Sequence, residues 1–179
     1  FDILLPVLIL VSSRAYPAYC LHKLTAGVEE GPYYKEGSPE RSNITESGVP
    51  GRPLILEGRV LDCNGNPVPG AWLDFWHANG DGIYHNDGYV LRGHQFADED
   101  GMYRLETVRP KKYQDRAAHI HVKVQSAKGA PTLTTQLFFP DEKRNETDPL
   151  FEPRTVVNLT ATEEREYAAF DFIVDTHVI

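Results

Sequence analysis

The chain has 179 residues, a formal net charge of -8 and a pI near 5.3. This length suits one compact domain, which can bury about 70% of its unfolded surface and does not need disulfides to hold a core. The acidic balance argues against nucleic acid and anionic membranes as partners, because their charges would repel such a surface.

An apolar run opens the sequence at residues 3–11 and is followed by small residues around Arg14. It is too short to span a bilayer, which needs about 20 apolar residues, but it suits the hydrophobic stretch of a secretory signal peptide. We therefore expect residues 1–15 to be a signal peptide whose charged start precedes Phe1, and the protein to be secreted, with no membrane contact after cleavage. The alternative is an apolar strand of the fold.

Two further features bear on secretion. Glycosylation acceptor patterns begin at Asn43, Asn145 and Asn158. Cys20 and Cys63 could form one disulfide in an oxidising compartment or remain two buried thiols, and the sequence leaves both readings open. Two cysteines without close spacing make no zinc site.

Residues 16–53 are expected to form an extended arm, because they are rich in Gly, Pro, Ser and charge without an apolar period. From residue 54 onward, short stretches of strand composition alternate with turns. The expected strands are residues 54–61, 71–77, 102–107, 119–125, 133–139 and 170–175. This pattern predicts an all-β domain over residues 54–179, an antiparallel β-sandwich with few short helices. The one helix expected covers residues 161–168, capped by Thr160 or Thr162.

The strongest local signal is the pair His119 and His121 within a predicted strand. Side chains alternate between the two faces of a strand, so both imidazoles should point the same way and could bind one metal ion. Ile120, Val122 and Val124 would then form the apolar face. Alone, the pair is also compatible with a half-exposed polar face.

Two tyrosines strengthen the metal hypothesis. Tyr84 follows a glycine-rich turn, and Tyr113 ends a basic loop ahead of the histidine strand. A phenol has a pKa near 10, so it becomes a ligand only when a strong Lewis acid removes its proton. Fe(III) does this better than zinc, and two phenolates would offset part of its charge. The alternative for each tyrosine is an aromatic at a strand edge with its hydroxyl in water.

Several short motifs follow one another between Gly31 and Asp141. They are GPYY at 31–34, PGA at 69–71, WHAN at 76–79, GIY at 82–84, DGMY at 100–103, PKKY at 110–113, RAAHIH at 116–121 and LTTQ at 133–136. Together, and in this order, they resemble the intradiol ring-cleavage dioxygenases, which include catechol 1,2-dioxygenase and protocatechuate 3,4-dioxygenase. The resemblance implies a catalytic domain at residues 54–179.

The resemblance also implies a role for each site residue. An Fe(III) ion would be held by Tyr84, Tyr113, His119 and His121, with Tyr113 the ligand that leaves when substrate binds. Arg116 matches the arginine that stabilises charge on the bound ring. Gln136 matches a glutamine near the same site, and Pro32 and Tyr33 match residues that border the substrate pocket.

The implied reaction cleaves a catechol between its two hydroxyls with O2, giving a cis,cis-muconic acid. Both oxygen atoms enter the product, so no reductant or organic cofactor is needed. The short connection from Tyr113 to His119 departs from the bacterial enzymes and predicts a different pocket wall. The chain is more similar to secreted short forms of fungi and plant-feeding mites, which suggests plant phenolics as substrates. The oligomeric state is not predicted.

Two other functions remain open from the residues alone. One is a secreted β-sandwich binding module without catalysis. The other is a zinc or copper site that uses only the histidine pair, with the tyrosines as bystanders. Three further histidines are expected to be hydrogen-bonded or solvent-exposed rather than catalytic: His77, His85 and His94.

Overall fold

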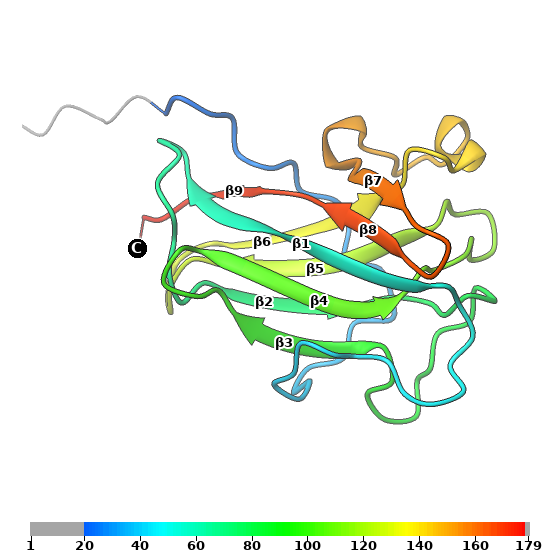
Figure 1. Ribbon diagram of the computed structural model, residues 1–179. Coiled ribbons are helices and arrows are strands. Elements are labelled where there is room, and N and C mark those ends of the chain that lie inside the picture. The colour runs from blue at the N-terminus through cyan, green and yellow to red at the C-terminus, as the bar shows by residue number, and fades with distance from the viewer. Residues whose placement is uncertain (1–19, 178–179) are drawn as a thin grey trace, which may run out of the picture.

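The computed structural model describes residues 20–177, so the expected signal peptide lies outside the described residues. This part of the chain holds strands throughout, with two short 3-10 helices between β6 and β7 (Figure 1). The strands are β1 (Pro53–Asp62), β2 (Trp72–Trp76), β3 (Arg92–Phe96), β4 (Met102–Val108), β5 (His119–Gln125), β6 (Thr132–Phe138), β7 (Asn158–Ala161), β8 (Glu166–Ala169) and β9 (Phe172–Val174). The helices are η1 (Lys143–Glu146) and η2 (Pro153–Thr155).

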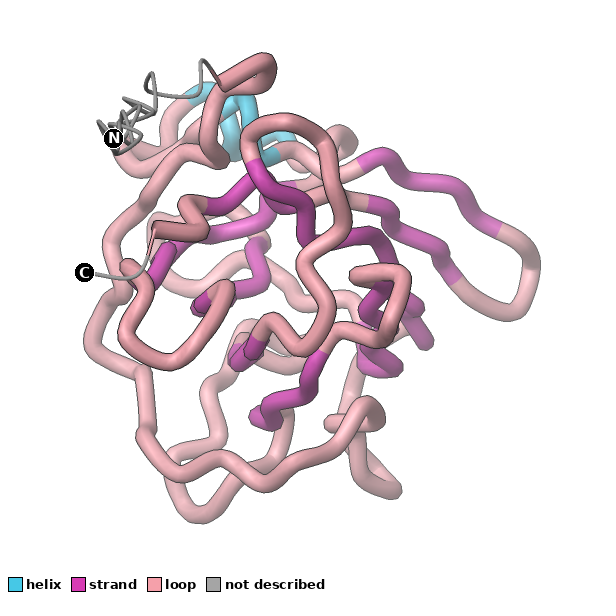
Figure 2. Tube along the Cα trace, turned by 90° about the vertical axis from the view of Figure 1, so that its left-hand side faces the viewer, coloured by secondary structure: helices cyan, strands magenta, loops and turns pink. Residues whose placement is uncertain are grey.

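The strands form two sheets, which confirms the predicted β-sandwich. One sheet has the order β4-β1-β8-β7, with β9 also paired to β1, and the other has the order β3-β2-β5-β6. The ladders are antiparallel except where β1 pairs with β8 and with β9. Figure 2, turned from the first view, shows that loops make up much of the chain around the strands.

Apolar side chains alternate along the strands and meet between the sheets. Leu73 and Phe75 of β2 and Ile120, Val122 and Val124 of β5 are at most 1% exposed and belong to one core cluster. Burying each such side chain contributes about 1.5–3 kcal/mol. Because strand side chains alternate, this packing turns the intervening residues of β2 and β5 to the outer face of the sheet.

One cross-strand row on that outer face runs over all four strands. Trp76 pairs with Arg92 on one side and with His121 on the other, and His121 pairs with Gln136. All four side chains are at most 3% exposed. The sheet register therefore gathers buried polar groups at one end of the face.

Residues 20–52 run along the edges of both sheets, drawn blue to cyan in Figure 1. An unpaired edge strand invites pairing with another chain, and the arm fills these positions instead. The hydrogen bonds include Val28 N to Thr134 O on β6, His94 N on β3 to Pro39 O, and Ile44 N to Glu106 O on β4. A disulfide joins Cys20 to Cys63, which decides between the two readings of these cysteines.

The expected helix at residues 161–168 is wrong. These residues belong to a hairpin in which β7 and β8 pair and Thr162 N donates to Arg165 O across the turn. Ala168, only 1% exposed, packs in the core as β8 runs parallel to β1. Sheet pairing and core burial here override the local helix propensity. Within residues 20–177, we find no helix that is long and apolar enough to cross a membrane.

Candidate metal centre

Three predicted metal-ligand side chains converge at the buried end of the outer face. His119 Nε2 lies 3.0 Å from His121 Nε2, and the Tyr84 hydroxyl lies 3.1 Å from His121 Nε2 and 3.4 Å from His119 Nε2. Ligand atoms about 2.1 Å from one metal ion and at right angles to each other would be roughly 3.0 Å apart. The spacing of the three atoms therefore fits donors to a single cation.

The hydrogen bonds of the histidines support this fit. His119 Nδ1 donates to the Ala117 carbonyl at 2.6 Å, so in the neutral ring Nε2 carries a lone pair. That lone pair points at Nε2 of His121. The second nitrogen of the His121 ring, Nδ1, is buried without a partner among the described residues. A cation accepting both Nε2 lone pairs would satisfy two buried nitrogens that otherwise face each other.

Burial keeps the histidines neutral and the tyrosine protonated in the absence of a cation. Burial lowers the pKa of His119 to about 4 and holds the pKa of His121 well below its usual range. Burial also raises the pKa of Tyr84, although the charges of Arg116 and Arg92 oppose this shift. Neutral imidazoles are the form that binds metals, whereas a Tyr84 phenolate needs a strong Lewis acid close by.

The loop that delivers Tyr84 is built by Asn79 and Gly82. The buried Asn79 Oδ1 accepts hydrogen bonds from the backbone of Asp81 and Ile83, at 2.9 and 3.0 Å. Gly82 has a φ of 79°, and a Cβ there would overlap the Lys112 carbonyl oxygen. Glycine thus lets the Tyr84 loop approach the loop that ends in Tyr113.

Tyr113 lies in the same pocket, but its hydroxyl contacts a different partner. It forms a short hydrogen bond with the Tyr33 hydroxyl, and this bond raises the pKa of Tyr113. The Tyr33 ring stacks on Tyr84 with centroids 4.3 Å apart and meets the Tyr113 ring edge-on at 5.2 Å. The structure therefore brings together three of the four predicted ligands and places the fourth beside them within an aromatic cluster.

These residues surround a cavity of about 210 Å³. The lining carries one cation, Arg116, and no carboxylate, so it suits a flat ligand that bears negative charge. Gln114, which sequence reasoning missed, also lines the cavity and has a left-handed φ of 51°. The lining residues are Gly31, Pro32, Tyr33, Tyr84, Tyr113, Gln114, Arg116, His119 and His121.

Arg116 is held by two side chains. Its Nη2 donates to Gln136 Oε1 at 2.6 Å, and its Nε donates to both oxygens of Asp148, at 2.8 and 3.0 Å. Gln136 was expected near the site and is fully buried, so it acts on the cavity through Arg116. Asp148 was missed because it stands in an irregular loop, 32 residues from Arg116, where no motif marks it.

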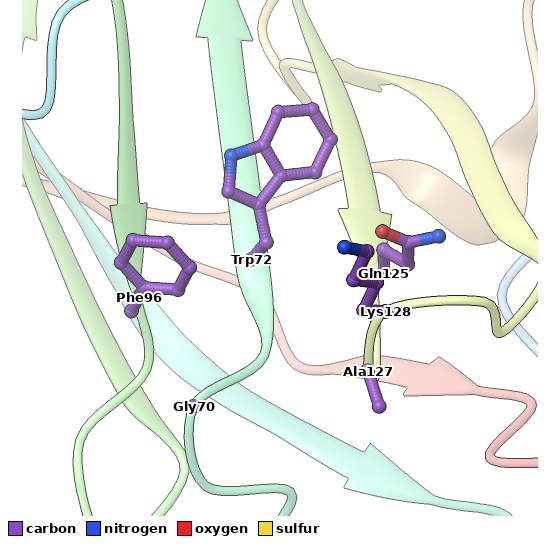
Figure 3. Close-up of a pocket in the computed structure, with 6 residues that line it drawn as sticks. All are labelled: Gly70, Trp72, Phe96, Gln125, Ala127 and Lys128. Carbon is purple, nitrogen blue, oxygen red and sulfur yellow. The ribbon is translucent and has the colours of Figure 1, made fainter.

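Elsewhere in residues 20–177, no cluster of three His, Cys, Asp or Glu side chains could hold a metal ion. At the candidate centre, the two histidines are joined by a tyrosine hydroxyl as the third possible ligand. A second depression lies at the other end of the outer face, where Phe96, Trp72 and Gln125 form another cross-strand row beside Lys128 (Figure 3). His77, His85 and His94 are hydrogen-bonded, as expected, and do not line the cavity.

The sequence model of the family described as Dioxygenase matches residues 29–176. A hydroxyquinol 1,2-dioxygenase of Rhizobium sp. (strain MTP-10005) is 32% identical over 161 residues, covering 73% of this chain and 54% of that protein. A chlorocatechol 1,2-dioxygenase of Rhodococcus opacus is 30% identical over 69% of this chain and 60% of its own length. The chain thus spans about half the length of the curated relatives it matches.

Solved structures of dioxygenases also resemble this chain. The dioxygenase domain of a dioxygenase carbohydrate-binding protein fusion from the cellulolytic bacterium Streptomyces sp. SirexAA-E is 43% identical, with a TM-score of 0.83 over 87% of this chain and 100% of that chain. An intradiol ring-cleavage dioxygenase from Tetranychus urticae shares the fold, with a TM-score of 0.77 at 23% identity over 87% of this chain and 96% of that chain.

Proposed function

The chain belongs to the intradiol ring-cleavage dioxygenase family, and from that membership we propose that it is an Fe(III)-dependent enzyme that cleaves catechols between their two hydroxyl groups. One observation carries the proposal. The Tyr84 hydroxyl and the Nε2 atoms of His119 and His121 lie within 3.4 Å of one another, beside a cavity whose one cation is Arg116.

Iron would be held by Tyr84, His119 and His121, with Tyr113 as the fourth ligand. Bound there, Fe(III) would supply a strong Lewis acid for the catechol oxygens and would make the ring reactive toward O2. The donor set fits this metal, because phenolate oxygen and neutral imidazole suit ferric iron, whereas softer ions prefer thiolates.

The remaining chemistry belongs to the protein. A catechol that binds as a dianion gives up two protons. The Tyr113 oxygen, a phenolate while it is a ligand, would take up one of them beside the Tyr33 hydroxyl, and a hydroxide from solvent would take up the other. The ring fits against the aromatic wall of Tyr33 and Tyr84, and the Arg116 guanidinium stabilises the negative charge that develops on it. The bond between the two oxygenated carbons breaks, and both atoms of O2 enter the muconic acid product.

We further propose that the protein is secreted and acts on plant phenolics. The Cys20–Cys63 disulfide supports secretion, because such bonds persist in oxidising compartments. The similar Streptomyces domain comes from a cellulolytic bacterium and is fused to a carbohydrate-binding protein, which supports plant-derived substrates. The carboxylate-free cavity lining is compatible with acidic as well as neutral catechols.

The first test is a visible spectrum of the iron-loaded protein, recorded before and after anaerobic addition of catechol. We expect a broad tyrosinate-to-iron band that shifts to longer wavelength with catechol, and muconic acid once air is admitted. Tyr84→Phe should lose most of the band and the turnover. Tyr89→Phe is the matched control, because its hydroxyl donates to Glu36 O on the surface and should leave both unchanged.

Two results would contradict the proposal. A protein that stays colourless after ferric reconstitution would be better explained as a binding module. Turnover with zinc or copper that survives loss of both tyrosine hydroxyls would instead favour a site made of the histidine pair alone.

A further inference from the structure

Asp148 is a fully buried carboxylate whose hydrogen-bond partners cluster around one residue. Its side chain is 0% exposed. Its oxygens accept from Arg116 Nε at 2.8 and 3.0 Å, and its Oδ2 also accepts from Ala117 N at 2.7 Å. Asp148 therefore holds both the side chain of Arg116 and the backbone directly after it.

The loop around Asp148 fixes its carboxylate independently of Arg116. Asp148 N donates to Arg144 O at 2.9 Å, and Phe151 N donates to Asp148 O at 3.1 Å. Leu150 N donates to Asp148 Oδ1 at 2.9 Å, and the Phe151 ring packs edge-on against Phe138 of β6. The carboxylate is thus oriented by its own loop, and the loop is anchored to the sheet that carries the histidines.

The guanidinium of Arg116 has a defined set of used and unused donors. Nε is taken by Asp148, and one donor of Nη2 by Gln136, whose own amide donates to Glu29 O of the arm at 2.7 Å. Within residues 20–177, Nη1 makes no hydrogen bond to protein. The two contacts fix the plane of the guanidinium and leave Nη1 for a ligand in the cavity that Arg116 lines.

The same contact sets the charge that a ligand meets. Arg116 pairs with Asp148 and with no other carboxylate in the described chain, so the pair is close to neutral. Without Asp148, the Arg116 guanidinium would attract an anionic ligand more strongly, but the plane of the guanidinium would be held by Gln136 alone.

We propose that Asp148 is a positioning residue for Arg116. The Asp148 carboxylate aims the Arg116 guanidinium at the ring-binding cavity and offsets the positive charge of the guanidinium. The expected effect of Asp148 on turnover rests on the proposed catechol chemistry. The expected effect of Asp148 on the orientation of Arg116 does not depend on turnover. Loss of the Asp148 charge should misdirect Arg116 and also strengthen ground-state binding of anions. Only an interaction that is stronger in the transition state than in the ground state speeds a reaction. A misdirected Arg116 would lose that interaction, so turnover should fall although the substrate binds no more weakly.

Asp148→Asn is the main variant, since it removes the charge and keeps the shape. Asp148→Glu keeps the charge but displaces it by one methylene. If Asp148→Asn does not fold, Asp148→Glu is used for the same measurements. Asp141→Asn is the matched control, because Asp141 pairs with Arg109 at 2.6 Å on the surface, outside the cavity. Each protein is compared with wild type by thermal unfolding before other measurements.

The readout independent of catalysis is exchange of the Arg116 Nε–H proton with water, followed by NMR. We expect exchange to become at least about tenfold faster in Asp148→Asn and to stay unchanged in Asp141→Asn. The dissociation constant of protocatechuate should stay equal or fall. In active enzyme, kcat for catechol should fall by about 10- to 100-fold without a rise in KM.

Unchanged Nε–H exchange would overturn the proposal. So would a lower melting temperature with unchanged kcat and KM, since Asp148 would then only hold its loop to the segment just before β5. If wild-type protein does not cleave catechols, the proposed function fails, but the exchange rate and protocatechuate affinity still decide whether Asp148 positions Arg116.

Discussion

Trp76 and His121 lie face to face, with ring centroids 4.7 Å apart and planes 6° from parallel. They are directly opposed partners on β2 and β5, and both rings are nearly fully buried. His121 Nδ1 has no hydrogen-bond partner in the described chain, so the indole face restrains this imidazole together with the contact of its Nε2 to the Tyr84 hydroxyl.

Replacing Trp76 by Leu should therefore loosen the metal centre. We expect a loss of about 2–4 kcal/mol in the free energy of unfolding and about tenfold weaker iron binding, measured by competition with a chelator. Trp76→Phe should restore most of the affinity, because it keeps an aromatic face. Trp72→Leu, at the other end of β2, should leave iron binding unchanged, and an equal loss in both leucine variants would contradict this role.

Replacing Gly82 by Ala should separate the two tyrosine loops. Gly82 and Gly88 both have left-handed φ values, 79° and 91°, so alanine is strained at either position. At Gly82 the added methyl also meets the Lys112 carbonyl, whereas at Gly88 nothing lies within 4 Å. Both variants should lose about 1 kcal/mol of stability from backbone strain. Only Gly82→Ala should also lose the tyrosinate band of the iron-loaded protein, which a parallel pair of spectra checks.

The stability of the metal-free protein should fall in acid partly through His77. Burial lowers the pKa of His77 to about 4, and its Nε2 bonds the Thr107 hydroxyl at 2.7 Å. The unfolded chain takes up a proton near pH 6.5 that the folded chain refuses until about pH 4, so this contribution is complete above pH 6.5 and is lost as pH falls through that window.

His77→Gln should flatten the dependence of unfolding free energy on pH by up to roughly 1.4 kcal/mol per unit in that window. Denaturant titrations at several pH values measure it. Thr107→Val removes the hydrogen-bond partner but leaves the buried imidazole, and it should keep the wild-type slope. An unchanged slope in His77→Gln would mean that other groups account for the acid sensitivity.

The three glycosylation patterns differ in structure. Asn145 Nδ2 donates to Phe139 O at 2.8 Å and its Oδ1 is buried, whereas Asn43 and Asn158 are exposed. In protein secreted from a eukaryotic host, we expect glycans on Asn43 and Asn158 but not on Asn145. Single Asn→Gln variants, compared by mass before and after deglycosylation, assign each site. A glycan on Asn145 in folded, secreted protein would contradict this.

The sequence predicted the parts of the site that local patterns encode. Alternation along residues 119–125 placed His119 and His121 on one face, and the glycine turn before Tyr84 marked a loop. Asp148 and Gln114 escaped prediction because their roles arise from tertiary contacts, with no residue spacing to reveal them.

Among the differences between the predicted and the observed fold, which also include the unpredicted β7, two are informative. β3 was missed because Arg92–Phe96 contains a glycine and mostly polar residues, which suit a strand only once the arm pairs with its free edge. The helix expected at residues 161–168 failed because β1 offers parallel pairing to Glu166–Ala169, a partner 112 residues away in sequence (Leu54 to Glu166) that no local rule weighs.

The contact between the arm and the last strand sets the order in which the protein can assemble. Thr25 N donates to Ile173 O at 2.9 Å, and Ile173 N donates back to the Thr25 hydroxyl at 2.8 Å. During synthesis, the start of the arm must therefore wait for β9 to leave the ribosome. The segment near Tyr33 does not share this delay, because Val28 N donates to Thr134 O on β6 and Arg92 Nη1 on β3 donates to Tyr33 O, both made before β9.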